Sequence, residues 1–465
     1  MNMINVRRLA VMTFLGAGML SDISAQDFSL QADTLNEARL PAQWDLQSCI
    51  DYALEQNITI RKNRVTAEST QIDVKTAKAA LFPSLSFSTS QQVVNRPYQE
   101  TSSRVSGSEI ISSNSKTSYN GNYGLNASWT IYNGSKRLKT LKQERLNNQV
   151  AELDVATSEN TIKESIAQIY IQILYAAESV RVNENTLQVS IAQRDRGQEL
   201  LNAGSIAKSD FAQLEAQVST DRYQLVTAQA TLQDYKLQLK QLLELDGENE
   251  MNVYLPKLSD ENVLAPLPAK KDVYVSALAI RPEIEASKLN VEASELGIDI
   301  AKSSYFPTIS LSAGIGTNHT SGSDFTFGEQ VKNGWNNSIG LSVSVPIFNN
   351  RQTKSAVQKA KLQRETNMLS LLDEQKALYK TIESLWLDAN SAQQRYAAAN
   401  EKLRSTQISY DLISEQFNLG MKNTVELLTE KNNLLQAQQE QLQAKYMAIL
   451  NTQLLKFYQG DKLTL

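Results

Sequence analysis

Residues that carry most enzyme chemistry are scarce in this sequence. Its 465 residues include one cysteine, Cys49, and one histidine, His319. A single cysteine excludes an internal disulfide framework and a multi-cysteine metal site, and a single histidine excludes a multi-histidine metal site. The sequence also lacks a P-loop or another glycine-rich nucleotide motif. We therefore predict that the protein is not an enzyme and holds no cofactor or metal. Cys49 is expected to be a small buried residue on a helix.

An excess of positive charge is also absent. The chain has 46 basic and 50 acidic residues. Proteins that bind nucleic acid need a basic surface to neutralise phosphates, so no nucleic-acid partner is expected.

Long apolar runs are missing too. Beyond the N-terminus, no stretch approaches the about 18 apolar residues that a membrane-spanning helix needs. At the N-terminus, Arg7-Arg8, the apolar run of residues 9–20 and the small residue Ala25 predict a secretory signal peptide over residues 1–25. A signal anchor is the alternative. An exported chain without apolar helices has β-strands as its remaining way into a membrane.

The chain contains a long internal repeat. Residues 77–88 and 301–312 both run from a helix-favouring stretch through Phe-Pro into strict apolar/polar alternation. Proline disfavours the helical conformation of the residue before it, and alternation is typical of a strand with two different faces. Further on, the matching stretches around Gly204 and Gly420 continue the repeat. The chain is therefore predicted to be two copies of one structural unit.

Two strands of about ten residues are expected in each half. A first strand begins near Ser84, and the alternation is explicit over residues 123–131, 309–315 and 339–345. One face of each strand is apolar and the other carries Ser, Gly, Asn and Thr, as in outer-membrane barrels. A pair of soluble hairpins packed on a core is the alternative.

The apolar face of these strands is expected to meet lipid at Leu125, Leu311 and Leu341. Trp129 fits either an aromatic anchor at the membrane interface or ordinary packing. The polar stretches 99–118 and 317–333 are the expected loops between strands, and the second loop contains His319.

Proline-free stretches predict unusually long helices. Residues 134–202 would form one helix of roughly 100 Å at 1.5 Å per residue, and residues 208–245 and 424–457 would form shorter helices. Apolar residues recur every seven positions in the shorter helices, which indicates coiled-coil packing. Asn133 and Asn349 are expected to cap the N-termini of the long helices.

These patterns divide the chain into five parts. The expected parts are a signal peptide at 1–25, a first repeat at 26–245, a lateral insert at 246–270, a second repeat at 271–457 and a C-terminal tail at 458–465.

A sheet of four strands has to be completed by other chains. The smallest membrane barrels have about eight strands, and an open sheet edge cannot lie in lipid because its backbone groups would be unpaired. Two chains would supply eight strands and three would supply twelve. Since the strands lead directly into helices, the helices are expected to continue the tube into the periplasm.

With these features the sequence resembles the TolC family of outer-membrane efflux channels, over essentially the whole mature chain. The resemblance rests on the two Phe-Pro transitions, on the strand ends at 131–134 and 346–350, and on the hairpin tips at 201–205 and 417–421. In one motif the chain departs from the family, because Asn349-Asn350 stand where members often have Gly-Gly. No single motif is specific, but their order, spacing and duplication are.

The resemblance implies a mainly α fold with a membrane β-barrel section. Three chains would form a twelve-stranded barrel in the outer membrane and a long α-helical barrel in the periplasm. The protein would be the passive exit duct of a tripartite efflux pump or a type I secretion system. Its partners would be a periplasmic adaptor, an inner-membrane transporter of the RND or ABC type, and outer-membrane lipid. The alternative is a structural or adhesive coiled-coil protein of the cell envelope.

The hairpin tips are the strongest site candidates. The family resemblance implies that adaptors dock there, at Gly204, Ser205, Gly420 and Met421, although each glycine also fits a simple helix-ending turn.

The resemblance also places a closed periplasmic aperture near the tips. Asp210 and Glu426 each lie six residues beyond a tip glycine, and Phe417 and Lys422 match positions that hold the hairpins shut in some members. A bond from Asp210 to Lys422 would be such a link. For the two carboxylates, a helix-terminal acid favoured by the helix dipole is the alternative.

Overall fold

The structure is a computed structural model. It describes residues 41–98, 102–106, 109–113, 116–246, 251–256, 263–321, 323 and 325–464. The predicted signal peptide at 1–25 lies outside the described residues, as do parts of the predicted insert. The chain divides into two compact units, and the larger comprises Asp45–Met251 and Leu255–Leu465. In the smaller unit, Trp44 and Val253 form a parallel β-bridge.

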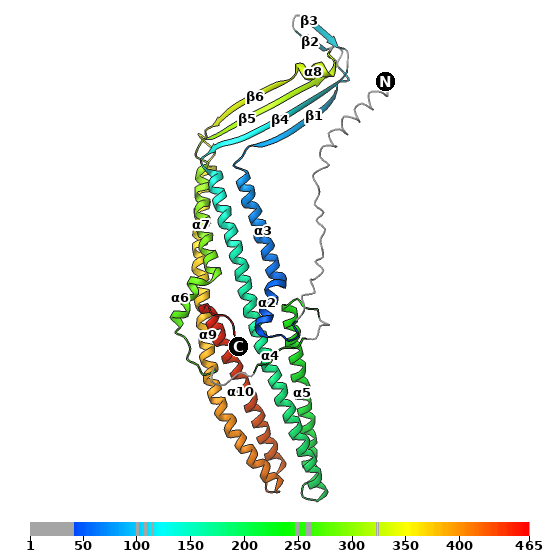
Figure 1. The fold of residues 1–465 in the computed structure, drawn as a ribbon, viewed down its shortest axis with the longest axis vertical. Helices are drawn as coiled ribbons and strands as arrows, with labels where there is room; N and C mark the ends of the chain where they lie inside the picture. Colours follow the sequence, from blue (N-terminus) through cyan, green and yellow to red (C-terminus); the bar gives the residue numbers. More distant parts are fainter. Residues whose placement is uncertain are drawn as a thin grey trace. The chain divides into compact units, whose positions relative to one another are not determined.

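Each half of the larger unit repeats one order of helices and strands (Figure 1). The first half contains α2 (Leu46–Gln56), α3 (Ile58–Ala79), β1 (Ser84–Asn95), β4 (Thr117–Asn133), α4 (Lys136–Asn202) and α5 (Lys208–Leu242). The second half contains α6 (Lys270–Ile280), α7 (Pro282–Ser303), β5 (Thr308–Thr320), β6 (Asn336–Ser344), α9 (Gln352–Asn418) and α10 (Thr424–Gln459). The long helices α4 and α9 have 67 residues each. The predicted mainly α fold, with four principal strands and an internal duplication, is confirmed.

The four principal strands form one antiparallel sheet in the order β1-β4-β5-β6, so β1 and β6 are its edges. The register places apolar residues opposite apolar residues across the sheet. Phe87 pairs with Leu125 and Leu125 with Ile315, and in another row Trp129 pairs with Leu311 and Leu311 with Leu341. The predicted apolar positions therefore lie on a single face, which we call the apolar face.

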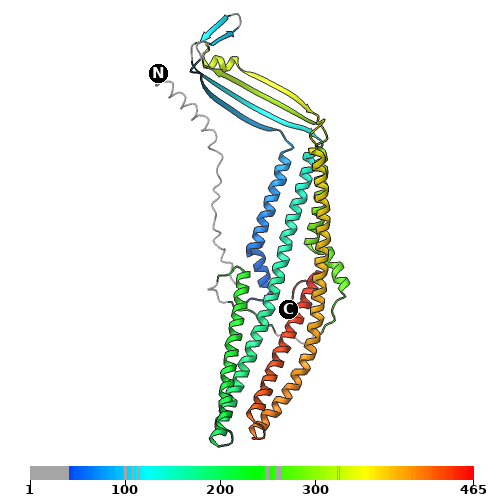
Figure 2. The ribbon, with the colours of Figure 1, turned by 180° about the vertical axis from the view of Figure 1, so that it is seen from behind.

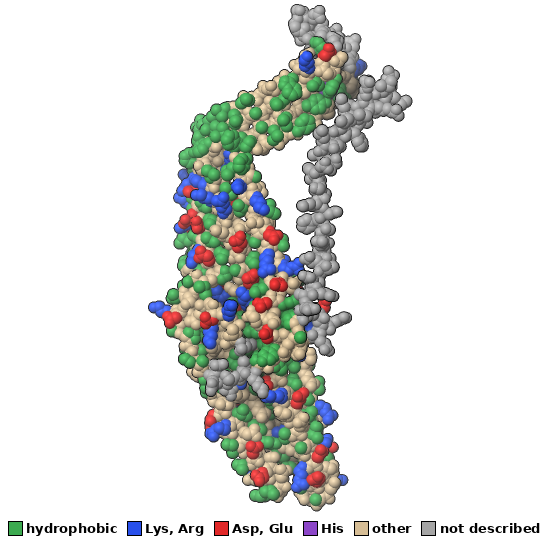
Figure 3. Space-filling view, in the orientation of Figure 1, with side chains coloured by type: hydrophobic (Ala, Val, Ile, Leu, Met, Phe, Trp, Pro, Cys, Tyr) green, Lys and Arg blue, Asp and Glu red, His purple; other side chains and the backbone are tan. Residues whose placement is uncertain are grey.

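The apolar face is open to the surroundings of the chain. Leu85, Ile339 and Leu341 are 69%, 82% and 66% exposed. Figure 3 shows hydrophobic side chains gathered over the sheet, whereas charged side chains lie mainly over the helices. The opposite face carries serine, glycine and asparagine in register, as in the row of Ser128 and Ser312. Such a separation of faces matches an outer-membrane strand set.

A β-bulge interrupts the alternation where β4 approaches α4. Thr130 pairs with Ser310, but the next pair along is Tyr132 with Ile309. Ile131 is therefore the extra residue, and Tyr132 takes the place on the apolar face that alternation predicted for Ile131. Beside the bulge, the Trp129 Nε1 donates a hydrogen bond of 2.9 Å to the carbonyl oxygen of Leu81, which ties the sheet to the end of α3.

The turns from strand to long helix differ from the prediction. Asn133 and Asn349 are not the N-caps: Ser135 and Arg351 occupy those positions, and neither makes a side-chain cap bond. The chain instead enters each helix through two consecutive left-handed residues, with φ of +66° and +62° at Gly134 and Ser135. These two residues lie before the helix, so it begins two residues later than capping by asparagine would place it.

The second turn explains the departure from Gly-Gly. Asn350 stands at the position equivalent to Gly134 and has a φ of +49°. Asparagine enters the left-handed region more readily than other residues with a side chain, so Asn350 replaces glycine there without changing the turn.

The helices near the middle of the larger unit break once in each half. Asn57 ends α2 and caps α3, with its Oδ1 accepting from the backbone N–H of Thr59 at 2.9 Å. Arg281 separates α6 from α7 with a similarly extended backbone but without a side-chain cap bond. Cys49 on α2 is fully buried, as predicted, and burial raises the pKa of its thiol to about 12. In the second half, buried residues of α6, α7, α9 and α10 form one apolar core. They are Val273, Ala277, Ile284, Leu378, Ile382, Ala389, Leu455 and Tyr458.

The two predicted loops contain regular structure. The first holds the hairpin of β2 (Ser102–Ser106) and β3 (Glu109–Ser113), and the second holds α8 (Phe327–Asn333). The prediction of His319 in a loop is wrong, because His319 belongs to β5 and pairs with Gly121. Its ring packs on Tyr119, Tyr123 and Phe327 at centroid distances of 5.0 to 6.1 Å, so aromatic packing extends the strand.

Within the described part of the chain, no helix is both long enough and apolar enough to cross a membrane.

Candidate functional site: the hairpin tips and the seam between them

The helices α4 and α5 form one long hairpin, and α9 and α10 form a second. The two lie side by side with their tips at the same end (Figures 1 and 2). The line along which the hairpins touch, mainly between α10 and α4, is called the seam.

Both tips end their first helix with the same backbone motif. The N–H of Gly204 bonds to the carbonyl of Leu201, and that of Ser205 to the carbonyl of Leu200. Gly420 and Met421 make the equivalent bonds in the second hairpin. These pairs of bonds define a Schellman cap, which requires a left-handed residue. The φ values of +72° at Gly204 and +74° at Gly420 supply it.

The second helices of the hairpins begin differently. In α10, the Asn423 Oδ1 accepts from the N–H of Glu426 at 2.9 Å, and Glu426 accepts from the N–H of Asn423 at 3.3 Å. This reciprocal arrangement is a capping box. In α5 the cap residue is Ala207, and only the acid contributes, with Asp210 accepting from the N–H of Ala207 at 3.4 Å. Both predicted aperture acids therefore also have the helix-terminal role.

Lys422 pairs within its own hairpin. Its Nζ lies 2.8 Å from Oε1 of Glu426. The hydrogen bond from Lys422 and the backbone bond from Asn423 lower the pKa of Glu426 below its ordinary value. Within this chain Asp210 accepts a hydrogen bond from the N–H of Ala207. The predicted Asp210–Lys422 bond is absent among the described contacts.

Phe417 closes the tip end of the seam by apolar packing. Its side chain is 2% exposed and forms a cluster with Leu214 of α5 and Leu427 of α10. The partly buried residues around this cluster are Leu200, Tyr410, Ile413 and Leu428. Since these residues come from all four helices, we call them the apolar cap of the seam.

A glycine in α4 makes room for the apolar cap. A Cβ atom at Gly197 would lie 2.4 Å from Cδ1 of Leu214. Glycine in a helix interior costs about 1 kcal/mol relative to alanine, and here it allows α5 to pack closely on α4.

A buried charged cluster lies next to the apolar cap, on the side away from the tips. The Lys431 Nζ of α10 bonds to Oδ2 of Asp221 on α5 and to Oγ of Ser190 on α4, and Ser190 donates to the same carboxylate oxygen. The side chains of Lys431 and Asp221 are only 4% and 2% exposed. The second carboxylate oxygen of Asp221 accepts from Gln217 at 2.9 Å. We call Ser190, Asp221 and Lys431 the seam triad.

The charge of Lys431 is only partly compensated. Burial lowers the pKa of Lys431 below its ordinary value, and the hydrogen bond to Asp221 opposes this effect without cancelling it. Asp221 therefore offsets only part of the cost of burying the ammonium group.

Further polar contacts continue the seam. Gln193 of α4 donates to the hydroxyl of Tyr410 on α9 at 2.8 Å, and Ser179 of α4 donates to Gln439 of α10 at 3.1 Å. Tyr175 and Tyr446 meet edge to face at a centroid distance of 6.3 Å. The hairpins are thus joined by polar and aromatic contacts along the seam and by an apolar cap at its tip end.

The sequence prediction missed the seam triad, although a signal for it exists. In the heptads of α5 and α10, Asp221 and Lys431 each follow an apolar core position, Val218 and Leu428, by three residues. A charged residue at the second core position of a heptad indicates a buried polar partner.

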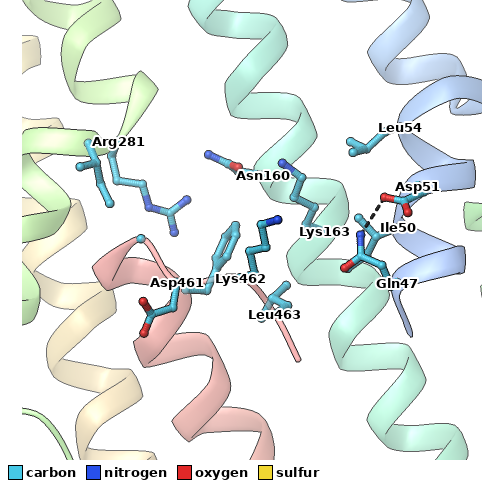
Figure 4. A pocket seen from close by; sticks show the side chains of 13 residues that line it. Gln47, Ile50, Asp51, Leu54, Asn160, Lys163, Arg281, Asp461, Lys462 and Leu463 are labelled. Carbon is cyan, nitrogen blue, oxygen red and sulfur yellow. Dashed lines mark hydrogen bonds between the residues drawn. The ribbon is translucent and has the colours of Figure 1, made fainter. Parts of the chain in front are cut away.

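A cavity of about 410 Å³ is lined by residues of α2, α4 and α10 and of the segment after α10 (Figure 4). Its lining contains charged residues of both signs, among them Lys163, Lys462, Asp51 and Asp461. Arg281, which also lines it, is bound to Glu164 at 2.7 Å and lies 3.6 Å from the ring centroid of Tyr458. Because the charges balance, this lining does not select a charged ligand. Among the described residues, no group of His, Cys, Asp and Glu side chains could hold a metal ion.

Comparison with known sequences identifies the family. The sequence model for "Outer membrane efflux protein" matches residues 49–244 and 273–460, which is most of the chain and once in each half. The chain belongs to the outer membrane efflux protein family. Membership of this family places it at the outer membrane, as predicted.

Individual members of the outer membrane efflux protein family show the extent of the likeness. The outer membrane efflux protein BepC of Brucella suis is 26% identical over 294 residues, covering 63% of this chain and 61% of BepC. The outer membrane protein TolC of Escherichia coli is 24% identical over 341 residues, covering 70% of this chain and 66% of TolC. These alignments span slightly less than two thirds of each relative.

A solved structure supports the fold over a longer span. The outer membrane protein VceC of Vibrio cholerae superimposes with a TM-score of 0.73 at 16% identity, covering 90% of this chain and 97% of VceC. The strands, long helices and hairpins thus follow the fold of VceC.

Proposed function

We propose that the protein is the outer-membrane exit channel of a tripartite efflux pump or a type I secretion system. One observation carries the proposal. A sheet with an exposed apolar face and a polar opposite face leads, in both halves, directly into 67-residue helices. Apolar strands suit lipid and a polar opposite face suits a water-filled lumen, and the helices extend the same wall away from the membrane.

Three copies of the chain complete the channel. The sheet has two free edges, β1 and β6, whose backbone groups need partners before they can enter lipid. Pairing β6 of each copy with β1 of the next supplies twelve strands, within the range of outer-membrane barrels. The helices of three copies then form an α-helical tube below the sheet.

The hairpin tips are the docking surface for a periplasmic adaptor. Gly204, Ser205 and Gly420 are exposed in the turns, and Leu419 and Met421 are 69% and 68% exposed. Large apolar side chains at an exposed turn favour a protein partner. An inner-membrane transporter of the RND or ABC type would complete the path, and the transporter would select efflux or protein secretion.

The tips also form the periplasmic aperture. Around a threefold axis, three Glu426 carboxylates make a ring that attracts cations. Each is paired with a Lys422 in the same hairpin, at 2.8 Å, so the lysine tempers the charge of the ring. The ring would bind multivalent cations added from the periplasmic side.

Conductance in planar bilayers tests the proposal. Detergent-extracted trimers should form ion-conducting channels, Glu426→Ala should weaken block by a trivalent cation, and Lys422→Ala should strengthen it. Glu401→Ala is the matched control, since Glu401 lies on α9 away from the tip. An envelope adhesin would form no channel, and unchanged block in Glu426→Ala would place the constriction elsewhere.

Labelling of intact cells tests the orientation. A cysteine at Ser321, between β5 and α8, should react with a membrane-impermeant thiol reagent. A cysteine at Gln438 on α10 should react only after the outer membrane is permeabilised. The reverse pattern would overturn the orientation.

A further inference from the structure

The seam triad is the point at which charge is buried between the two hairpins. Its three side chains come from three helices, Ser190 from α4, Asp221 from α5 and Lys431 from α10. It therefore adds a buried ion pair to the other contacts between the two hairpins.

Separation of the hairpins would expose this charge to water. Leu427 of the apolar cap lies one helical turn from Lys431 on α10 and is fully buried. With the cap in place, water is kept from the ion pair. When the cap parts, the ammonium and carboxylate groups regain the hydration that they lost on burial.

The energetics of such a pair favour its hydration. Removing charges from water costs several kcal/mol per ion, and replacing a buried pair by apolar side chains of similar volume is often neutral or stabilising even when the pair is hydrogen-bonded. The lowered pKa of Lys431 agrees, because its protonated form is disfavoured in the packed seam. The pair thus lowers the free-energy difference between a packed seam and a parted one.

We propose that the buried Lys431–Asp221 pair keeps the seam poised to open, so that the hairpins part as a unit when water reaches the pair. This inference rests on the proposed channel function. It reverses the usual expectation for an ion pair across a contact, since the pair makes the closed seam less stable than apolar packing would.

Two variants distinguish a buried pair that favours opening of the seam from a buried pair that holds the seam closed. In Lys431→Met/Asp221→Leu both charges are replaced by apolar side chains of similar size, so the fraction of open channels should fall below wild type, by about tenfold. In Lys431→Met the carboxylate is left buried without its cation, so the open fraction should rise above wild type. A pair that holds the seam closed would instead give a double variant that opens at least as readily as wild type, and that result would overturn the proposal.

An exposed ion pair provides the matched control. Lys402 and Glu440 join α9 to α10 within one hairpin at 2.8 Å, and both are more than 40% exposed. The variant Lys402→Met/Glu440→Leu removes the same charge types without burial and should leave the open fraction unchanged. A change equal to that of the buried double variant would also overturn the proposal.

A distance measurement keeps the test independent of conductance. Spin labels on Ser205→Cys and Met421→Cys report the separation of the two tips, and Cys49 does not compete because it is fully buried. The double apolar variant should narrow the distance distribution and Lys431→Met should broaden it. If wild-type protein conducts no ions, the channel function fails, while these distances still decide the role of the pair.

The exchanged pair Asp221→Lys/Lys431→Asp covers the case in which the apolar variant does not fold. It retains a buried ion pair, so its open fraction and tip distances should stay close to wild type. An exchanged pair that behaves like Lys431→Met would overturn the proposal.

Discussion

The two halves of the chain share a backbone but differ in the side chains at their contact. Their long helices have 67 residues each, and their tips close with the same cap. Yet the position equivalent to buried Lys431 in the second hairpin is exposed Glu215 in the first, and the position equivalent to Asp221 is Ala437.

The difference shows what the duplication has to preserve. Residues that set the backbone recur in both halves, such as the glycines of the tips. Residues that join one half to the other cannot recur, because a contact between unlike hairpins needs complementary groups and not identical ones. The seam triad is such a contact, since a lysine meets an aspartate only if the two copies have diverged.

The largest expected contrast lies between Lys431 and its counterpart. Lys431→Met should lower the free energy of local opening of α5 and α10 by about 3–5 kcal/mol, because the buried Asp221 carboxylate loses its partner. The locally opened population should therefore rise. Glu215→Met should change it by no more than about 0.5 kcal/mol. Hydrogen exchange of the tip amides measures the opening free energy of both variants. Similar changes in the two variants would contradict the different roles given to Lys431 and Glu215.

The tip glycines should show no contrast. Gly204→Ala and Gly420→Ala should each cost about 1–2 kcal/mol, because alanine is strained at positive φ while no atom within 4 Å obstructs its Cβ. The same exchange measurement applies. A cost confined to one tip would show that the two caps are not equivalent.

The helix starts should show a smaller contrast of opposite sign. Asn423→Ala should destabilise the start of α10 by about 1 kcal/mol, since the side-chain half of the capping box is lost. Ala207→Asn should stabilise α5, because it supplies the cap that α5 lacks. If Ala207→Asn did not stabilise α5, or if Asn423→Ala did not destabilise α10, the difference between the two caps would be contradicted.

The smallest expected effect concerns the pH dependence of the second tip. The folded pKa of Glu426 is lowered mainly by Lys422, so its stabilisation is present above the ordinary glutamate pKa and is lost as pH falls through the lowered value. Lys422→Ala should move this loss toward higher pH. NMR titration of the Glu426 carboxyl group checks it, and an unmoved titration would mean that Lys422 has no such role.

The sequence predicted the backbone well where the signal is local. The Phe-Pro transitions and the tip glycines each depend on residues within one turn, so they could be found without tertiary information. The predicted caps at Asn133 and Asn349 were wrong because the turn geometry is set by contacts across the fold. Ser303 of α7 donates to the carbonyl of Gly134 at 2.9 Å.

Contacts between helices were harder to predict. Phe417 was expected to link the hairpins near the aperture, and it does lie between them, but as part of an apolar cap. Lys431 and Asp221 are 210 residues apart, so periodicity can mark each as a core position without identifying its partner. His319 was misplaced because an aromatic cluster from three segments extends β5 beyond the alternating pattern.

Disulfide cross-linking across the sheet edges tests the central claim, that three copies of this chain close one barrel. A cysteine at Ser342 of β6 would be combined in turn with cysteines at Ser84, Ser86 and Ser88 of β1, which scan the register between copies. At the correct register, oxidation of the outer-membrane fraction should give a covalent ladder that ends at three chains. Cross-links absent from every pair, or a ladder that ends at two chains or continues beyond three, would contradict the account.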